Sequence, residues 1–208
     1  MTDPEHQTAD PVAAERLDQQ LRFLREVDRL KSVERQNILA DGSRRENSAE
    51  HSWHVALAAL CLSEHGAGGI DRFKLVQMLL LHDIVEVDAG DAFLHDPDAL
   101  AAQARKEAAA AERIFGLLPA DQRDAFLALW HEFEARSSPE SVLAHAIDRV
   151  QPALLHEATG GVIWEKYGTT HAQIQTKMGV VREAAPRLWR WVQSVIERAL
   201  AAGRLRAG

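Results

Sequence analysis

Histidine is the residue type most available for chemistry in this sequence of 208 residues. The chain holds ten histidines but only one cysteine and one tyrosine. The single cysteine, Cys61, allows neither an internal disulfide nor a cysteine-based zinc site. Imidazole and carboxylate groups therefore remain as candidate metal ligands, and the composition is compatible with a metal site built from them.

Two neighbouring polar residues, His82 and Asp83, follow an apolar segment. A carboxylate at the C-terminal end of a helix meets the negative end of the helix dipole, which costs roughly 0.3–1 kcal/mol. Burying that carboxylate unpaired would cost several kcal/mol more, and a bound divalent cation would offset both costs. An ion pair between Asp83 and an arginine, with His82 in an ordinary core hydrogen bond, explains the same pattern.

Two other segments carry the residue types of a metal site. Asp148 lies in the otherwise largely apolar segment 144–150, and aspartate is rarely buried alone. Pro152 cannot donate a hydrogen bond to the carbonyl of Asp148, so we expect a distorted helix there. His51 and His54 are three residues apart and lie on neighbouring faces of a helix, so at most one of them is expected to bind a metal.

The order of these residues, His51, then His82-Asp83, then Asp148, resembles that of the HD phosphohydrolase superfamily. Longer segments resemble the HD-domain 5'-deoxynucleotidases more closely, and the resemblance covers about residues 17–200. The segments that carry it are Leu30–Arg35, Arg44–Ser52, His82–Asp91 and Ala146–Arg149.

The resemblance implies a set of metal ligands and catalytic residues. It implies one divalent ion (Mn, Co, Fe, Zn or Mg) held by His51, His82, Asp83 and Asp148. Asp83 would also be catalytic through the metal, and Glu86 would assist proton transfer around the attacking water. Arg35 would bind the phosphate, and Asp91 would contact the sugar hydroxyl.

One position departs from the family pattern. Bacterial members carry a tryptophan directly after the phosphate-binding arginine, whereas this chain has Gln36. A glutamine can hydrogen-bond a 2'-hydroxyl instead of excluding it. Gln36 is therefore a candidate substrate-binding residue, and we expect hydrolysis of ribonucleotides as well as deoxyribonucleotides. Alternatively, Trp53 fills the same space and preserves selection of deoxyribose.

Three functions are compatible with these residues. The first is a metal-dependent 5'-nucleotidase that removes phosphate from (deoxy)nucleoside 5'-monophosphates by a metal-activated water. The second is hydrolysis of a pyrophosphate or phosphodiester, as in guanosine tetraphosphate hydrolases, but those carry aspartate where this chain has Val87. The third is a non-catalytic helical module that binds a structural metal or dimerises through its tryptophan-rich C-terminal helix.

The elements that position these residues are predicted to be almost all helical. Runs of β-branched residues with period two are missing, and Ala, Leu, Glu and Arg dominate. We expect an all-α fold, an HD-domain helical bundle whose central apolar helix carries the His-Asp pair. The predicted helices cover residues 11–33, 49–63, 70–83, 98–116, 120–135, 139–158 and, as one or two helices, 170–202. Residues 34–47 and 87–97 are expected as polar connections.

Two local patterns refine this prediction. Leu17, Leu21, Leu24, Val27 and Leu30 share one face of the first helix. Ser137, followed three residues later by Glu140, is typical of a capping box at the start of the helix over 139–158.

Length and charge limit the classes of protein. We expect a single domain over residues 12–203, with a polar arm over 1–11 and a tail over 204–208. The formal charge of −7 disfavours general binding to nucleic acid or to anionic membranes. No apolar run approaches about 18 residues, and the acidic N-terminus is unlike a signal peptide. We therefore expect a cytoplasmic protein. The resemblance implies a small phosphate ester as its substrate, and we also expect a homodimer.

Overall fold

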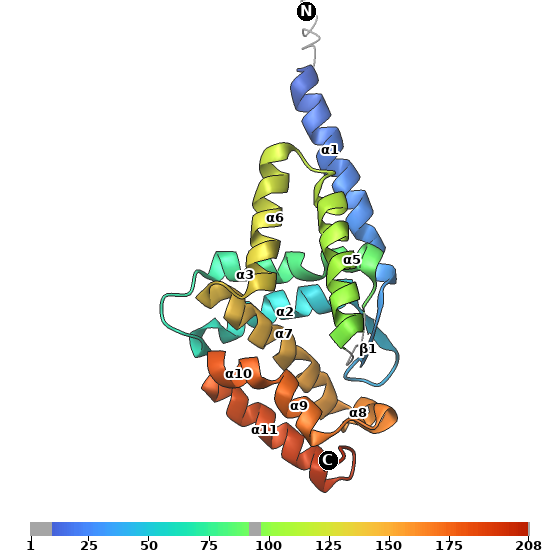
Figure 1. Ribbon diagram of the computed structural model, residues 1–208, viewed down its shortest axis with the longest axis vertical. Helices are drawn as coiled ribbons and strands as arrows, with labels where there is room; N and C mark the ends of the chain where they lie inside the picture. The colour runs from blue at the N-terminus through green and yellow to red at the C-terminus, as the bar shows by residue number, and fades with distance from the viewer. Residues whose placement is uncertain (1–9, 92–96, 208) are drawn as a thin grey trace, which may run out of the picture.

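The computed structural model describes residues 10–91 and 97–207, so most of the predicted polar arm lies outside it. The described part is almost entirely helical (Figure 1), which confirms the all-α prediction. The α-helices are α1 (Pro11–Val27), α2 (Ser48–Leu62), α3 (Arg72–Leu81), α4 (Glu86–Ala89), α5 (Pro97–Phe115), α6 (Ala120–Ala135), α7 (Pro139–Ala158), α8 (Val162–Tyr167), α9 (His171–Lys177), α10 (Gly179–Ala184) and α11 (Pro186–Ala201). Short 3-10 turns are η1 (Asp28–Ser32), η2 (Ser63–His65) and η3 (His82–Val85).

A hairpin replaces the polar connection expected over residues 34–47. Strands β1 (Glu34–Ile38) and β2 (Arg45–Asn47) pair antiparallel, with a register irregularity between their two ends. Gly42 takes a positive φ of 75° in the turn between the strands, a conformation that glycine adopts without steric cost. The strands are short and mostly polar, so period-two hydrophobicity could not indicate them.

Two apolar clusters hold the helices together. The first cluster lies among α2, α3, α7, α10 and α11, and its fully buried members include Leu75, Met78, Leu79, Ile147 and Val192. The second cluster joins α1, η3, α5 and α6, and it includes Phe23, Leu81, Ile84, Ile114 and Phe115. The end of α3 therefore lies where the two clusters meet.

Only one side of helix α3 is buried in the core. The sequence predicts a helix that is apolar on nearly all sides and wholly buried. In the structure Phe73 is 72% exposed and Leu80 is 46% exposed. The elements that the structure describes do not cover these two side chains.

Helix α1 also differs from its predicted form. It ends at Val27 rather than near Val33, and η1 follows it. The helix projects beyond the rest of the molecule (Figure 1), and only its C-terminal part reaches the second cluster. Phe23 is buried there, whereas Leu17, Leu21 and Leu24 on the predicted apolar face are exposed, so this part of the helix turns a different face to the domain.

Two smaller predictions are corrected near α7 and the C-terminus. The capping box of α7 joins Ser138 and Ser141 rather than Ser137 and Glu140, because the carboxylate of Glu140 instead accepts a hydrogen bond from the backbone of Asp71. Helix α7 runs through Pro152 to Ala158, as its predicted bounds require. The segment predicted as a tail packs against the domain through the buried Leu205. No helix in the described ranges is long and apolar enough to cross a membrane.

Candidate metal centre and substrate cavities

His51 lies in the first turns of α2, directly after the hairpin. A capping box fixes the start of this helix: the Asn47 side chain accepts from the Glu50 backbone N–H at 3.0 Å, and the Glu50 carboxylate accepts from the Asn47 backbone N–H at 3.1 Å. The cap satisfies N–H groups that have no partner within the helix. It thereby fixes the helical turn that carries His51 into the interior, where its side chain is fully buried.

The sequence predicts His82 and Asp83 as the last two residues of their helix, but in the structure they follow directly after its end. α3 ends at Leu81, and the pair begins the 3-10 turn η3. Leu79 before the pair belongs to the first cluster, and Ile84 after it belongs to the second. Packing on both sides therefore fixes the orientation of this turn.

Asp148 lies in the middle of α7 and meets both histidines. Its Oδ1 atom is 2.9 Å from Nε2 of His51 and 3.7 Å from Nε2 of His82. Asp83 is equally close, with its carboxylate oxygens 3.7 Å from Nε2 of His51 and 3.1 Å from Nε2 of His82. The fold thus brings together all four ligands that the resemblance implies.

The orientation of the two imidazoles suits a metal ion. Nδ1 of His82 donates to the carbonyl of Leu79 at 2.9 Å, and Nδ1 of His51 donates to Oε1 of Gln151 at 3.0 Å. These bonds leave both Nε2 atoms as the ligating atoms, and Nε2 of His82 is buried without a hydrogen bond. Ligand atoms of His51, His82 and Asp83 all lie within 4.8 Å of one another.

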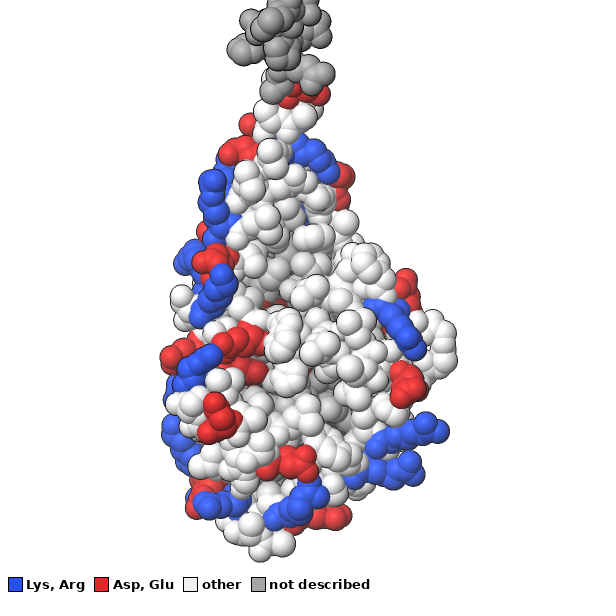
Figure 2. Space-filling model, turned by 180° about the vertical axis from the view of Figure 1, so that it is seen from behind, with Lys and Arg blue, Asp and Glu red and all other residues white. Residues whose placement is uncertain are grey.

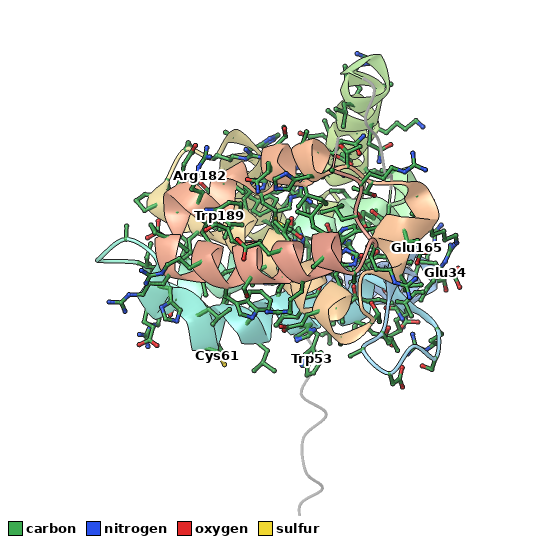
Figure 3. The ribbon with its side chains drawn as sticks, turned by 90° about the horizontal axis from the view of Figure 1, so that it is seen from below. Glu34, Trp53, Cys61, Glu165, Arg182 and Trp189 are labelled. Atoms are coloured by element: carbon green, nitrogen blue, oxygen red, sulfur yellow. The ribbon has the colours of Figure 1, made fainter. Side chains whose placement is uncertain are left out.

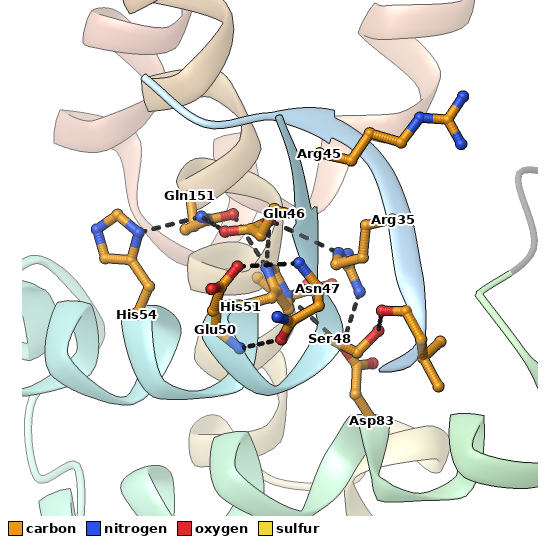
Figure 4. Close-up of polar contacts among 12 residues, drawn as sticks. Arg35, Arg45, Glu46, Asn47, Ser48, Glu50, His51, His54, Asp83 and Gln151 are labelled. Carbon is orange, nitrogen blue, oxygen red and sulfur yellow. Dashed lines mark hydrogen bonds and ion pairs between the residues drawn. The ribbon is translucent and has the colours of Figure 1, made fainter. Parts of the chain in front are cut away.

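Gln151 and Glu46 form a buried support that sequence reasoning missed (Figure 4). Nε2 of Gln151 donates to Oε1 of Glu46 at 2.6 Å and lies 3.1 Å from Nδ1 of His54. His54 therefore belongs to this support and not to the metal cluster. The one available signal was spacing, because Gln151 follows Asp148 by three residues and so lies on the same side of α7.

The carboxylates around His51 favour a positive charge at the centre of this cluster. Burial and the nearby Arg35 charge oppose protonation of His51, but the hydrogen bond to Asp148 and the nearby carboxylates of Glu46 and Asp83 outweigh them. The pKa of His51 rises to about 9 as a result. A proton occupies the place that a divalent cation would take, so metal binding must displace it.

Arg35 and Glu86 lie beside the cluster. Nη1 of Arg35 is 2.8 Å from Oδ2 of Asp83 and 3.7 Å from Oε1 of Glu86. Oε2 of Glu86 accepts a hydrogen bond from the hydroxyl of Ser48 at 2.5 Å. Burial and the charge of Asp83 raise the pKa of Glu86 to about 9. Because Ser48 is bonded to Oε2 of Glu86, the other oxygen, Oε1, is the one available for proton transfer.

The sugar-contact candidates lie further from the cluster. Gln36 follows Arg35 on β1, and its Oε1 accepts a hydrogen bond from the Tyr167 hydroxyl. Asp91 lies after α4, and its pKa is raised by burial despite the opposing charge of Arg35. Trp53 does not fill the space near Gln36, because it is 64% exposed and points outward from α2 (Figure 3).

Two cavities meet at Arg35 and Asp91. The first has a volume of about 340 Å³ and is lined by His82, Asp83, Glu86 and Asp148. The second has a volume of about 310 Å³ and lies between β1 and helices α7, α8 and α9. Arg149 borders both cavities. The metal-ligand cluster thus opens into a space large enough for a small ligand.

A family model confirms the resemblance drawn from the motifs. Residues 27–189 match the model of the HD domain. This chain belongs to the HD-domain family. The segment matched contains every candidate ligand of the metal centre.

Individual relatives are similar in sequence and in structure. The chain is 30% identical over 135 residues to human 5'-deoxynucleotidase HDDC2, covering 64% of this chain and 65% of that protein. It is 28% identical over 136 residues to the zebrafish (Danio rerio) protein of the same name, covering 65% of this chain and 66% of that protein. The matched region therefore spans slightly less than two thirds of these relatives.

A solved structure is similar over nearly the whole chain. It is a crystal structure from Magnetospirillum magnetotacticum, described as a predicted metal-dependent phosphohydrolase. The two chains are 41% identical with a TM-score of 0.89, and the match covers 94% of this chain and 98% of the other. The HD-domain architecture is therefore shared from α1 to the C-terminal helices.

Proposed function

We propose that this HD-domain protein is a metal-dependent phosphohydrolase that removes phosphate from nucleoside 5'-monophosphates. The main support is that His51, His82, Asp83 and Asp148 converge beside a cavity that also holds Arg35 and Glu86. The names of the similar proteins, 5'-deoxynucleotidase and metal-dependent phosphohydrolase, point to the same chemistry.

The four converging residues would hold one divalent ion. Two imidazoles and two carboxylates suit Mn, Co, Fe, Zn or Mg, and the residues themselves do not select one of these ions. When bound, such an ion supplies a Lewis acid that polarises a phosphoryl oxygen and lowers the pKa of a water. The buried, hydrogen-bond-free Nε2 of His82 supports this role, because such an atom otherwise goes unsatisfied.

Arg35 would bind the phosphate group. Its guanidinium is buried and already lies against Asp83, and the charges of Asp83 and Glu86 raise its pKa despite its burial. The group therefore stays charged and can offer paired N–H donors to phosphate oxygens. Glu86 would accept or deliver a proton at Oε1, since Ser48 holds its other oxygen.

Gln36 and Asp91 would contact the sugar. The Tyr167 hydroxyl donates to Oε1 of Gln36, so the amide NH2 is the part of this side chain that can bond a ligand. An NH2 group can donate to a 2'-hydroxyl oxygen. We therefore propose that the enzyme accepts ribonucleotides as well as deoxyribonucleotides.

One assay tests this function against its alternatives. The protein is chelated, reloaded with Mn or Co, and incubated with nucleoside monophosphates, guanosine tetraphosphate and a cyclic phosphodiester. Metal-dependent phosphate release from the monophosphates is expected. Hydrolysis of the other two classes alone would favour the pyrophosphohydrolase alternative, whose expected aspartate is replaced here by the half-buried Val87. Metal binding without turnover on any substrate would favour a non-catalytic module.

We also propose that two copies associate through the back of the molecule. An uncharged surface runs down the middle of this face (Figure 2). Helices α1, α2 and α3 carry exposed apolar side chains that could contribute to it, namely Leu17, Leu21, Leu24, Trp53, Leu57, Leu60, Phe73 and Leu80. A patch of this extent on a monomer typically marks an interface. The tryptophan-rich α11 fits that role less well, because Trp189 is buried in the first cluster.

Light scattering during gel filtration tests the dimer. Replacing Leu24 and Leu80 with glutamate places charge on the proposed interface and is expected to give monomers. A wild-type monomer at tens of micromolar would contradict the proposal. A cytoplasmic location is proposed as well, supported by a chain whose one cysteine leaves it independent of disulfides.

A further inference from the structure

The second cavity differs in chemistry from the first. Its floor is apolar and includes Ile163, Trp164 and Met178, all of which are buried. His156 packs against the Trp164 ring with centroids 4.2 Å apart. Burial lowers the pKa of His156 to about 4, so its ring is neutral at neutral pH. This floor suits a flat, uncharged ring system.

Fixed amide groups stand at the rim of the same cavity. In the capping box of α9, the side-chain Oε1 of Gln173 accepts from the Thr170 backbone N–H at 2.9 Å. The carbonyl oxygen of the Gln173 side chain therefore points toward the N-terminus of α9. The NH2 of Gln173 remains as a donor, as does the NH2 of Gln36 on the opposite wall. Both walls thus offer donors to carbonyl or ring-nitrogen acceptors.

Cations outnumber carboxylates at the junction between the two cavities, where Asp91 is the carboxylate that borders both. Arg35 and Arg149 border both cavities, and Lys177 lines the second. Lys177 and Arg149 line the same cavity, and burial together with the charge of Arg149 lowers the pKa of Lys177. An anionic group at this junction would reduce the repulsion between these cations. A phosphate at the junction would place its ester substituent beside the apolar floor.

We propose that the second cavity binds the nucleoside part of the substrate, and that Gln173 is a specificity-determining residue that donates to the base. This inference rests on the proposed nucleotidase function. It extends that function by assigning the leaving group to the space between β1 and helices α7 to α9. Gln173 comes from a helix that contributes no candidate ligand to the metal centre.

Substrates that differ only in their leaving group test this assignment. The metal-loaded protein is assayed with the four common ribonucleoside 5'-monophosphates and with phenyl phosphate, which has a leaving group too small to reach Gln173. In Gln173→Glu, a carboxylate oxygen can still accept from Thr170, so the capping box survives while the NH2 donor is lost. Gln173→Met removes the donor without adding charge. Gln175→Glu is the matched control, because its side chain bonds His171 on the same helix.

The decisive quantity is kcat/KM for the best nucleotide divided by kcat/KM for phenyl phosphate. This ratio is expected to fall roughly tenfold in both Gln173 variants, the effect of losing one hydrogen bond, and to stay unchanged in Gln175→Glu. Calorimetry on chelated protein adds a readout without turnover: adenosine, cytidine, guanosine or uridine should bind the wild type more tightly than either variant.

Different failures separate the two proposals. If kcat/KM falls equally on the nucleotide and on phenyl phosphate in the Gln173 variants, or falls on neither, the role of Gln173 is overturned. The nucleotidase function then stays in place. Turnover of phenyl phosphate without turnover of any nucleotide would overturn both the nucleoside cavity and the nucleotide substrate, and leave a phosphohydrolase. Absence of phosphate release from every substrate would overturn the function and this inference together.

Discussion

At the scale of single residues, the candidate metal centre depends on groups that do not touch a metal. Gln151 is fully buried and joins His51, His54 and Glu46. Its carbonyl fixes the ring orientation of His51, so that Nε2 faces Asp83 and Asp148. Sequence patterns can suggest ligands by type and order, but a supporting glutamine has no such signature. The four ligands were therefore predictable in a way that Gln151 and Glu46 were not.

Gln151→Leu keeps the volume of this side chain and removes its hydrogen bonds. We expect metal affinity to fall about 10- to 100-fold, the usual effect of removing a group that orients a metal-binding histidine. Isothermal titration with Mn or Co measures it. Gln122→Leu, on the surface beside Gln20, is the control, and equal affinities in all three proteins would contradict the role of Gln151.

Glu86→Gln tests proton transfer without disturbing the fold, because an amide oxygen can still accept from Ser48. We expect metal content to stay near the wild-type level and the turnover number to fall by about 10²- to 10⁴-fold. Metal analysis and steady-state kinetics provide the two readouts. A turnover number near that of the wild type would remove Glu86 from the mechanism.

Gln36→Trp tests the choice of sugar. The indole would crowd a 2'-hydroxyl, whereas the amide can donate to it, so the variant should favour deoxyribose by about 5- to 150-fold relative to the wild type. The measurement is kcat/KM on matched ribo- and deoxyribonucleoside monophosphates. A strong deoxyribose preference already present in the wild type, and unchanged by the substitution, would count against this role.

At the scale of elements, the sequence predicts helices with clear start signals better than it predicts short polar strands. Helices α6 and α7 match their predicted bounds, and each has a proline at its start, Pro119 as the N-cap of α6 and Pro139 as the first residue of α7. The β1–β2 hairpin was missed, although it carries Arg35 and Gln36 to the junction of the two cavities. Its strands are too short and too polar to show a period. Pairing between the two strands, rather than the preference of either segment alone, places these two side chains.

The capping box of α2 links helix stability to the metal centre. Asn47→Ala should cost about 1 kcal/mol of unfolding free energy, which corresponds to roughly 2–4 °C in melting temperature for a chain of this size. It should also weaken metal binding, since His51 lies in the capped turn. Ser138→Ala at the start of α7 is the control: a similar loss of stability is expected there without a loss of metal affinity. Equal metal affinity in both variants would contradict the link.

At the scale of the whole molecule, the buried histidines make stability depend on pH. His156 is 7% exposed, and burial lowers its pKa from 6.5 to about 4. The unfolded chain therefore takes up a proton at a higher pH than the folded one. Stability from this residue is complete above about pH 6.5 and is lost as the pH falls to about 4, a loss of roughly 3 kcal/mol.

Urea unfolding of chelated protein between pH 7 and pH 4 measures this loss. His156→Leu should show a shallower decline in unfolding free energy over that window, whatever its stability at pH 7. His131→Leu, at an exposed position on α6, should decline as steeply as the wild type. The same slope in His156→Leu as in the wild type would assign the pH dependence to other groups.

The convergence of α2, η3 and α7 on one point has a consequence for the amount of folded protein in a cell. These elements come from distant parts of the chain and meet only in the folded state. An ion bound where they meet binds the folded chain and not the unfolded one, so it shifts the folding equilibrium by mass action. The shift grows with the logarithm of the free ion concentration once the site is mostly filled. Metal scarcity would then lower the abundance of this protein as well as its activity, because unfolded chains are the ones that proteases remove.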